Sequence, residues 1–215
     1  MREVFSIVLA TQNPGKVAEF QRLLAGLPVS LLSVTDALGR PLEVTEDGDT
    51  FAENALKKAR AVAEATRMMA LADDSGLEVT ALAGRPGVRS ARFAHERATD
   101  AENNAALLHE LAEVADEQRA ARFRCVLSLV SADGREARTF EGSCNGRIAR
   151  APRGSNGFGY DPLFLVDGRG GTTMAELSAD EKNRISHRGR AVEALRPALL
   201  TLVNQYLDVA ERALG

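Results

Sequence analysis

Apolar runs alternate with amphipathic stretches along the chain, and each kind of pattern predicts a different element. Runs of apolar or alternating residues predict strands. They cover residues 4–11, 29–34, 68–72, 122–131, 136–144 and 162–166. Apolar residues spaced three and four positions apart predict helices. They cover residues 17–27, about 50–67, about 98–114 and 186 to about 213.

Turn and capping residues mark the limits of several of these elements. The tetrapeptide Ala-Asp-Gly-Arg at 132–135 predicts that the strands around it form a β-hairpin. Ser178 and Glu181 form a capping box that opens a further short helix. Ser186 can cap the last helix, in which Pro197 predicts a kink. Strands alternating with helices around a central hairpin predict a single mixed α/β domain that spans the chain, with an elongated or split sheet.

The composition excludes several classes of protein. The 215 residues are 45% hydrophobic and 27% charged, which is typical of a globular chain with a sizeable core. A net charge of −3 disfavours non-specific binding to DNA or to an anionic membrane. Cys125 and Cys144 form no disulfide framework, and no apolar stretch reaches the roughly 20 residues that span a bilayer. We therefore expect a soluble, reduced, cytoplasmic protein that binds neither nucleic acid nor membrane.

The first candidate for chemistry is the turn between the first strand and the first helix. Its residues are Thr11, Gln12, Asn13, Pro14, Gly15 and Lys16. Backbone N–H groups at a helix start bind phosphate, and Lys16, one of only four lysines, would add a positive charge. The glycine spacing and Val17 exclude a Walker A loop. By itself the motif is more typical of a plain strand-to-helix turn with Lys16 in solvent.

Acidic residues form the second candidate. Asp73 and Asp74 follow an apolar strand that we expect to end at residue 72, and their side chains point in opposite directions if the chain is extended. Carboxylates at such a strand end suit Mg²⁺ bound jointly by protein and phosphate. Glu46, in an acidic loop at 35–49, offers a second carboxylate. A surface turn and a solvated loop are the alternative interpretations.

An aromatic turn and a basic helix junction complete the candidates. Glycines at 157 and 159 flank Phe158, and Tyr160 and Asp161 follow. Aromatic rings in such a turn can stack on a flat base, or they can anchor the turn to the core. The junction near residue 186 carries donors suited to carbonyl or phosphate oxygens. They are Lys182, His187 and Arg188.

Taken together and in this order, the motifs resemble the inosine triphosphate pyrophosphatase family, which hydrolyses deaminated purine nucleoside triphosphates. The motifs are LATQNPGK (9–16), FAENALKKA (51–59), LADDSGLEV (71–79), GRPGVRSARF (84–93), GFGYDPLF (157–164) and EKNRISHRGRA (181–191). The resemblance implies an elongated α/β fold with two lobes around a nucleotide cleft, a homodimer and a requirement for Mg²⁺. It implies hydrolysis of the triphosphates of inosine, deoxyinosine and xanthosine, which removes them from the nucleotide pool.

The resemblance also implies roles for individual residues. Those that would hold the triphosphate are Thr11, Gln12, Asn13, Pro14, Gly15 and Lys16, assisted by Ser75. Those that would bind the purine are Phe158, Gly159, Tyr160, Asp161, Lys182, His187 and Arg188. Asp74 would be the metal-linked general base, and Glu46 a second Mg²⁺ ligand. The first motif has Gln12, Asn13 and Pro14 where many relatives have a glycine, so this loop is expected to be stiffer.

Two other functions use some of the same residues. The related septum-inhibitor type of nucleotide pyrophosphatase opens with Ser-x-Ser-Pro-Arg, which this sequence lacks. A non-catalytic nucleotide sensor or an RNA-binding module would use Phe158, Tyr160 and the basic helix. Such a module has no need of Asp74 beside a triphosphate loop, so an Asp74→Asn variant separates a sensor from an enzyme.

Overall fold

The computed structural model describes residues 5–214, without the side chains of residues 210, 211, 213 and 214. Its strands are β1 (Phe5–Leu9), β2 (Val29–Ser33), β3 (Ala70–Val79), β4 (Ala120–Val130), β5 (Ala137–Ile148) and β6 (Phe164–Val166). Its α-helices are α1 (Pro14–Leu23), α2 (Val34–Leu38), α3 (Phe51–Thr66), α4 (Asp100–Glu110), α5 (Ala179–Ile185) and α6 (His187–Leu214). Short 3₁₀ helices cover Thr80–Leu82, Gly87–Arg92, Asp116–Gln118, Asp161–Leu163 and Met174–Glu176.

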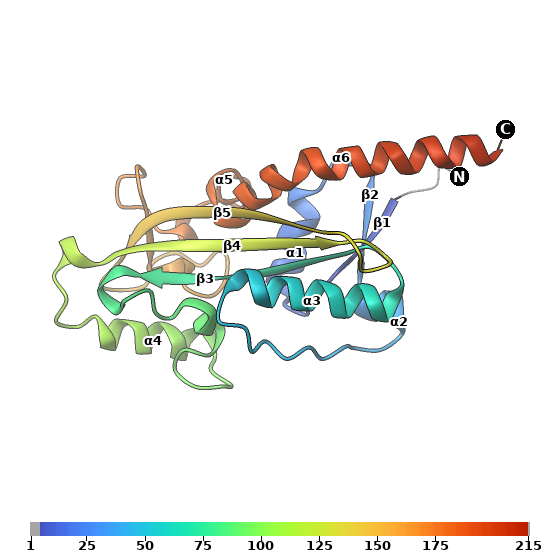
Figure 1. Ribbon diagram of the computed structural model, residues 1–215. Helices are drawn as coiled ribbons and strands as arrows, with labels where there is room; N and C mark the ends of the chain where they lie inside the picture. Colours follow the sequence, from blue (N-terminus) through green and yellow to red (C-terminus); the bar gives the residue numbers. More distant parts are fainter. Residues whose placement is uncertain (1–4, 215) are drawn as a thin grey trace. The chain divides into compact units, whose positions relative to one another are not determined.

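The six strands form one mixed sheet in the order β2-β1-β3-β4-β5-β6 (Figure 1). β1 pairs in parallel with β2 and β3, and β6 pairs antiparallel with β5. The predicted hairpin joins β4 to β5, and the Ser131 N–H closes its turn by donating to the Glu136 carbonyl at 3.0 Å. The predicted α/β class, with a mixed sheet flanked by helices, is confirmed.

The chain divides into two compact units, and the expectation that it behaves as one domain stays a prediction. Unit 1 contains residues 1–74, 126–141 and 191–215. In it α3 and α6 lie on opposite sides of the strands (Figure 1). The inner face of α3 packs on β1 and β3. The buried apolar residues of this core are Val8, Ala10, Val34, Ala59, Val62, Ala63, Ala70, Ala72 and Val130.

Unit 2 contains residues 75–125 and 142–190. Its core joins α4 to the remaining parts of β3, β4, β5 and β6 through buried side chains. Leu77, Leu107, Phe123, Phe164 and Met174 are among these residues. In neither unit is a described helix long and apolar enough to cross a membrane.

Local signals predicted several helix ends correctly. The Ser178–Glu181 capping box opens α5. The Ser186 hydroxyl accepts a hydrogen bond from the Gly189 N–H at 3.1 Å at the start of α6, as an N-cap does. Pro197 lies inside α6, and the kink expected there stays a prediction. The predicted first strand, 4–11, is shorter in the structure, and its residue Val4 lies outside the described residues.

Two expectations were wrong. Asp73 and Asp74 do not follow the end of a strand, because β3 continues through them to Val79 and its polar side chains find buried partners. The start of the supposed loop at 35–49 is helical, because Ser33 and Asp36 form a capping box that opens α2.

Candidate active site

The first helix begins inside the predicted phosphate-binding turn. Pro14 is its first residue, and the side chain of Asn13 caps it by accepting the Lys16 N–H at 3.1 Å. The Asn13 N–H in turn donates to the Thr11 hydroxyl at 3.2 Å. The structure therefore contains the predicted helix N-terminus with Lys16 in its first turn, an arrangement that favours an anionic ligand.

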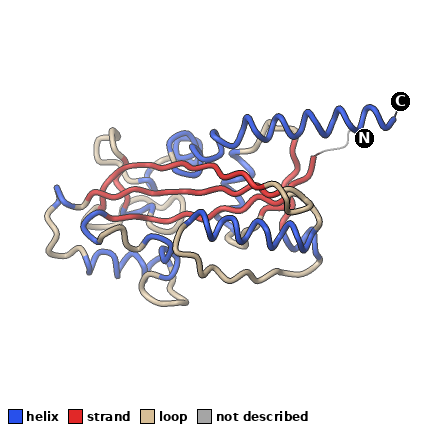
Figure 2. The backbone as a smooth tube through the Cα atoms, in the orientation of Figure 1, coloured by secondary structure: helices blue, strands red, loops and turns tan. Residues whose placement is uncertain are grey.

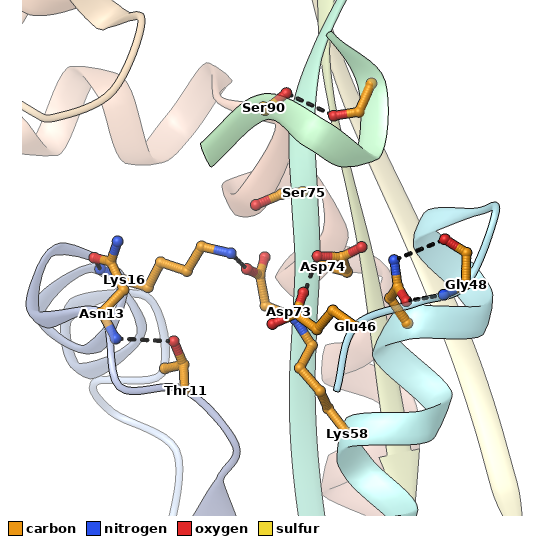
Figure 3. A network of polar contacts seen from close by, with 12 residues as sticks. Thr11, Asn13, Lys16, Glu46, Gly48, Lys58, Asp73, Asp74, Ser75 and Ser90 are labelled. Atoms are coloured by element: carbon orange, nitrogen blue, oxygen red, sulfur yellow. Dashed lines mark hydrogen bonds and ion pairs between the residues drawn. The ribbon is translucent and has the colours of Figure 1, made fainter. Parts of the chain in front are cut away.

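Asp73 and Asp74 project from opposite faces of β3, as the alternation of an extended strand requires. Asp73 is 1% exposed and forms an ion pair with Lys16 (Figure 3). On the other face, the Oδ1 atom of Asp74 lies 3.3 Å from the Nζ atom of Lys58 in α3. Each carboxylate thus has its own lysine, so two cations stabilise two acids that lie in the interior of a sheet.

Lys58 connects the two predicted metal ligands. Its Nζ atom lies 3.1 Å from Oε2 of Glu46 and 3.3 Å from Oδ1 of Asp74 (Figure 3). Lysines on helices are usually solvated, but Lys58 is 9% exposed. One signal could have revealed it: Lys58 lies three positions after Ala55 and four before Val62, on the apolar stripe of α3.

Burial sets the protonation of this cluster. It raises the pKa of Asp74 to about 6, although Lys58 and Lys16 act in the opposite direction. Burial lowers the pKa of Lys58, but the carboxylates of Asp74 and Glu46 outweigh it, so its net pKa is raised. The Oδ2 atom of Asp74 is buried and makes no hydrogen bond to any described residue. This oxygen is available to accept a proton or to bind a cation.

In unit 2 the structure brings together four of the predicted base-binding residues. The Asp161 carboxylate accepts hydrogen bonds from Nζ of Lys182 at 2.5 Å and from the Phe158 N–H at 3.0 Å. Nζ of Lys182 lies 4.7 Å from the centroid of the Phe158 ring, and the Arg188 guanidinium lies 5.6 Å from it. Two cations therefore hold one aromatic side chain through cation–π contacts.

The other predicted residues of unit 2 have different surroundings. Arg188 is 1% exposed and donates to the Ser75 hydroxyl at 2.8 Å. The His187 ring stacks on Phe123, with centroids 4.7 Å apart. Tyr160 is 4% exposed, and its hydroxyl donates to the Ser90 carbonyl at 2.8 Å, so its side chain anchors the turn to the core. Ser75 and Arg188 are in contact, whereas Tyr160 is directed into the core.

Helix α4 holds the aromatic turn, a contact that no pattern in the sequence predicts. The Gly159 N–H donates to Oδ2 of Asp100 at 2.7 Å, and the Gly159 carbonyl accepts from Nδ2 of Asn104 at 2.9 Å. Asp100 and Asn104 are one helical turn apart on the same face of α4. Gly159 has a φ of +62°, a conformation that L side chains rarely adopt, so the position favours glycine.

Comparison with known proteins identifies the family. The model of the Ham1 family matches residues 7–198, which is most of the chain. The chain belongs to the Ham1 family. Proteins named dITP/XTP pyrophosphatase are similar to it: one from Geobacter sulfurreducens is 53% identical over 90% of this chain and 96% of its own length. Another, from Bacillus subtilis, is 50% identical over 89% of this chain and 96% of its own length.

Solved structures of this family agree with the fold. A HAM1 protein from Coxiella burnetii superposes with a TM-score of 0.82 at 46% identity, covering 91% of this chain and 98% of its own. A protein titled nucleoside-triphosphatase / dITP/XTP pyrophosphatase, from Mycobacterium abscessus, has a TM-score of 0.71 at 47% identity. It covers 89% of this chain and 99% of its own. The family resemblance inferred from the motifs is confirmed.

Proposed function

We propose that this Ham1-family protein hydrolyses the triphosphates of deoxyinosine, inosine and xanthosine to the nucleoside monophosphate and pyrophosphate. The reaction keeps deaminated purines out of DNA and RNA. One observation in the structure carries the proposal beyond family membership. Asp74 presents a buried carboxylate oxygen that makes no hydrogen bond within the described part of the chain, and its pKa of about 6 suits a base that takes a proton from water near neutral pH. A sensor would need no such group.

The residues of unit 1 have the chemistry of a magnesium site. Mg²⁺ prefers hard oxygen ligands, often one or two carboxylates together with substrate phosphates. The Asp74 carboxylate would supply one such ligand, and Glu46, whose carboxylate contacts the same Lys58 ammonium, would supply the second. These two residues would hold the ion, which when bound neutralises charge on the triphosphate. Among the described residues no three or more His, Cys, Asp or Glu side chains are arranged to hold a metal ion, so phosphate oxygens would complete the coordination.

In the proposed reaction Asp74 accepts a proton from the water that attacks the α-phosphorus. The bond from the α-phosphorus to the oxygen of the β-phosphate breaks, and pyrophosphate leaves with that oxygen. The N-terminus of α1 and the Lys16 ammonium bind the triphosphate and stabilise its charge. Lys16 now pairs with Asp73, so the substrate must compete with this carboxylate for the ammonium. Ser75, which follows Asp74, would assist phosphate binding.

The residues of unit 2 would select the purine. Phe158 would stack on the base, and the donors of Lys182, His187 and Arg188 would read its 6-oxo group. An adenine amino group would face these donors without accepting from them, and unpaired donors reduce turnover by up to about 10⁴-fold. Asp161, which holds Lys182 and the turn, would support the pocket. Tyr160 would contribute through its backbone, because its hydroxyl is already bound to Ser90.

A product assay tests this function. The protein is incubated with Mg²⁺ and the triphosphates of inosine, xanthosine, guanosine or adenosine, and pyrophosphate and orthophosphate are measured separately. We expect pyrophosphate from the first two and little product from the last two. Orthophosphate, or equal turnover of all four, would contradict the proposal. A buffer with a chelator in place of Mg²⁺ is the control, and it should abolish turnover.

We also propose, from the family resemblance, that the protein acts as a homodimer in the cytoplasm. Sedimentation equilibrium measures the first property directly, and a mass close to the 23.0 kDa of a single chain would contradict it. Fractionation of cells tests the second.

A further inference from the structure

Glu46 lies in a segment without helix or strand, yet its carboxylate has a defined place. Residues 39–50 connect α2 to α3 as an irregular stretch (Figure 2). An unanchored loop of this kind would present its side chains in many positions. Glu46 nevertheless lies 3.1 Å from Lys58, which also contacts Asp74. Some contact must therefore fix the backbone close to Glu46.

Asn54 makes that contact. It lies in the first turn of α3 and is 1% exposed. Its Oδ1 atom accepts the Gly48 N–H at 2.8 Å, and its Nδ2 atom donates to the Gly48 carbonyl at 3.3 Å (Figure 3). One buried amide thus binds both polar groups of a residue that lies two positions after Glu46, as a neighbouring strand would do.

The fit between Asn54 and Gly48 leaves no room for a side chain. A Cβ atom added to Gly48 would lie 2.7 Å from Oδ1 of Asn54 and 2.9 Å from Cβ of Glu53, so one of these groups would have to move. The glycine is required for close approach and not for an unusual φ. The two residues therefore form a matched pair.

The other contacts of this segment are more exposed. The Glu53 carboxylate accepts hydrogen bonds from the N–H groups of Asp49 and Thr50, and these bonds belong to the cap at the start of α3. Asp47 pairs with Lys57, and the side chains of that pair are 65% and 44% exposed. Such a surface ion pair contributes little to stability. Asn54 is the buried member of this set.

We propose that Asn54 is a positioning residue for the cation site: through Gly48 it holds Glu46 in place to bind the metal together with Asp74. The inference rests on the proposed function in assigning a metal to these carboxylates. Asn54 itself touches neither metal nor substrate. Without it, Glu46 must be ordered when the cation binds, which lowers affinity. Loss of an outer residue that orients a metal ligand typically weakens binding by about 10–100-fold.

The experiment compares Asn54→Ala with Lys57→Ala, which removes an exposed contact between the same helix and the same segment. Mn²⁺ binding to the metal-free protein, without nucleotide, is followed by electron paramagnetic resonance. The Mg²⁺ concentration that gives half-maximal kcat with inosine triphosphate is measured in parallel. We expect Asn54→Ala to raise the Kd for Mn²⁺ and this Mg²⁺ concentration about tenfold each. The kcat at saturating Mg²⁺ should be largely retained. Lys57→Ala should change neither by more than about twofold.

Gly48→Ala disturbs the same contact at its other, partly exposed residue. This variant replaces Asn54→Ala in the experiment if Asn54→Ala fails to fold. Because the new Cβ displaces the segment, this variant should also raise both concentrations. In the double variant the shortened residue 54 makes room for that Cβ, so the two effects should be clearly less than additive. Additive effects would indicate two unrelated disturbances and would overturn the inference.

Other results overturn the inference without touching the proposed function. Unchanged Mn²⁺ and Mg²⁺ requirements in both single variants would show that Glu46 needs no such support. If the wild-type protein binds no Mn²⁺ without nucleotide, because the phosphate oxygens are missing from the coordination, an unchanged Mg²⁺ requirement in both single variants overturns the inference by itself. Conversely, a wild-type protein that binds Mn²⁺ but releases no pyrophosphate would refute the proposed function, while the Mn²⁺ series would still decide the role of Asn54.

Discussion

Replacing Asp74 by asparagine separates catalysis from stability. The amide keeps the shape of the side chain but cannot carry the negative charge. Burial raises the pKa of Asp74 from 3.8 to about 6, so the ionised form is unfavourable in the folded protein. A difference of roughly 2 units corresponds to about 3 kcal/mol. The wild-type protein carries this penalty at pH 8, and Asp74→Asn removes it.

The sign of the pH dependence follows from the direction of the shift. Below the unfolded pKa near 4, Asp74 is protonated in both states and contributes nothing. As pH rises toward 6, the unfolded chain releases its proton first, so wild-type stability falls. We expect Asp74→Asn to be more stable by about 1–3 kcal/mol at pH 8, and by roughly half as much at pH 5. The lower bound allows for the loss of one Lys58 partner.

Two assays check these values. Urea unfolding in the presence of a chelator gives the free energy of unfolding at each pH, and pyrophosphate release from inosine triphosphate gives kcat. Loss of a general base should reduce kcat by about 10²–10⁴-fold. Asp208→Asn, at an exposed position of α6, is the matched control and should change neither quantity. An Asp74→Asn protein that is less stable at pH 8, or that turns over like the wild type, would refute the reasoning.

Three further predictions concern unit 2. Asp161→Asn removes the carboxylate that pairs with the buried Lys182 ammonium, so urea unfolding should show a free energy of unfolding lower by about 3 kcal/mol or more. Adding Lys182→Met to this variant removes the unpaired charge and should recover much of the loss. Asn104→Ala should release the aromatic turn and raise KM for inosine triphosphate several-fold while kcat is retained; an equal fall in kcat would contradict this. Tyr160→Phe removes the bond to Ser90, so thermal or urea unfolding should show a loss of about 1 kcal/mol, with KM unchanged if the hydroxyl only anchors the turn.

The sequence by itself determined most of the elements and the family. The Ser178–Glu181 capping box and the Ser186 cap mark where helices begin, and each depends on two residues three positions apart. The local sequence is therefore sufficient to predict these helix ends. The hairpin at 132–135 is equally local. The order of the motifs was sufficient for the family, because a fixed series of short motifs is far more specific than any one of them.

Only the tertiary structure decided which polar residues lie inside. β3 continues through Asp73 and Asp74 because Lys16 and Lys58 approach from α1 and α3, and Lys16 lies 57 positions from Asp73 along the chain. A local pattern cannot show that a charge has such a partner, so it predicted the end of a strand where β3 continues.

The same reason applies to Asn54. In the sequence it is one polar residue in the first turn of a helix, and only the approach of the irregular segment shows that it binds Gly48. Buried polar groups are stable only when folding supplies their hydrogen bonds, and those partners come from other elements. The identity of the candidate site residues was therefore in the sequence, whereas the contacts that fix their positions arose in the fold.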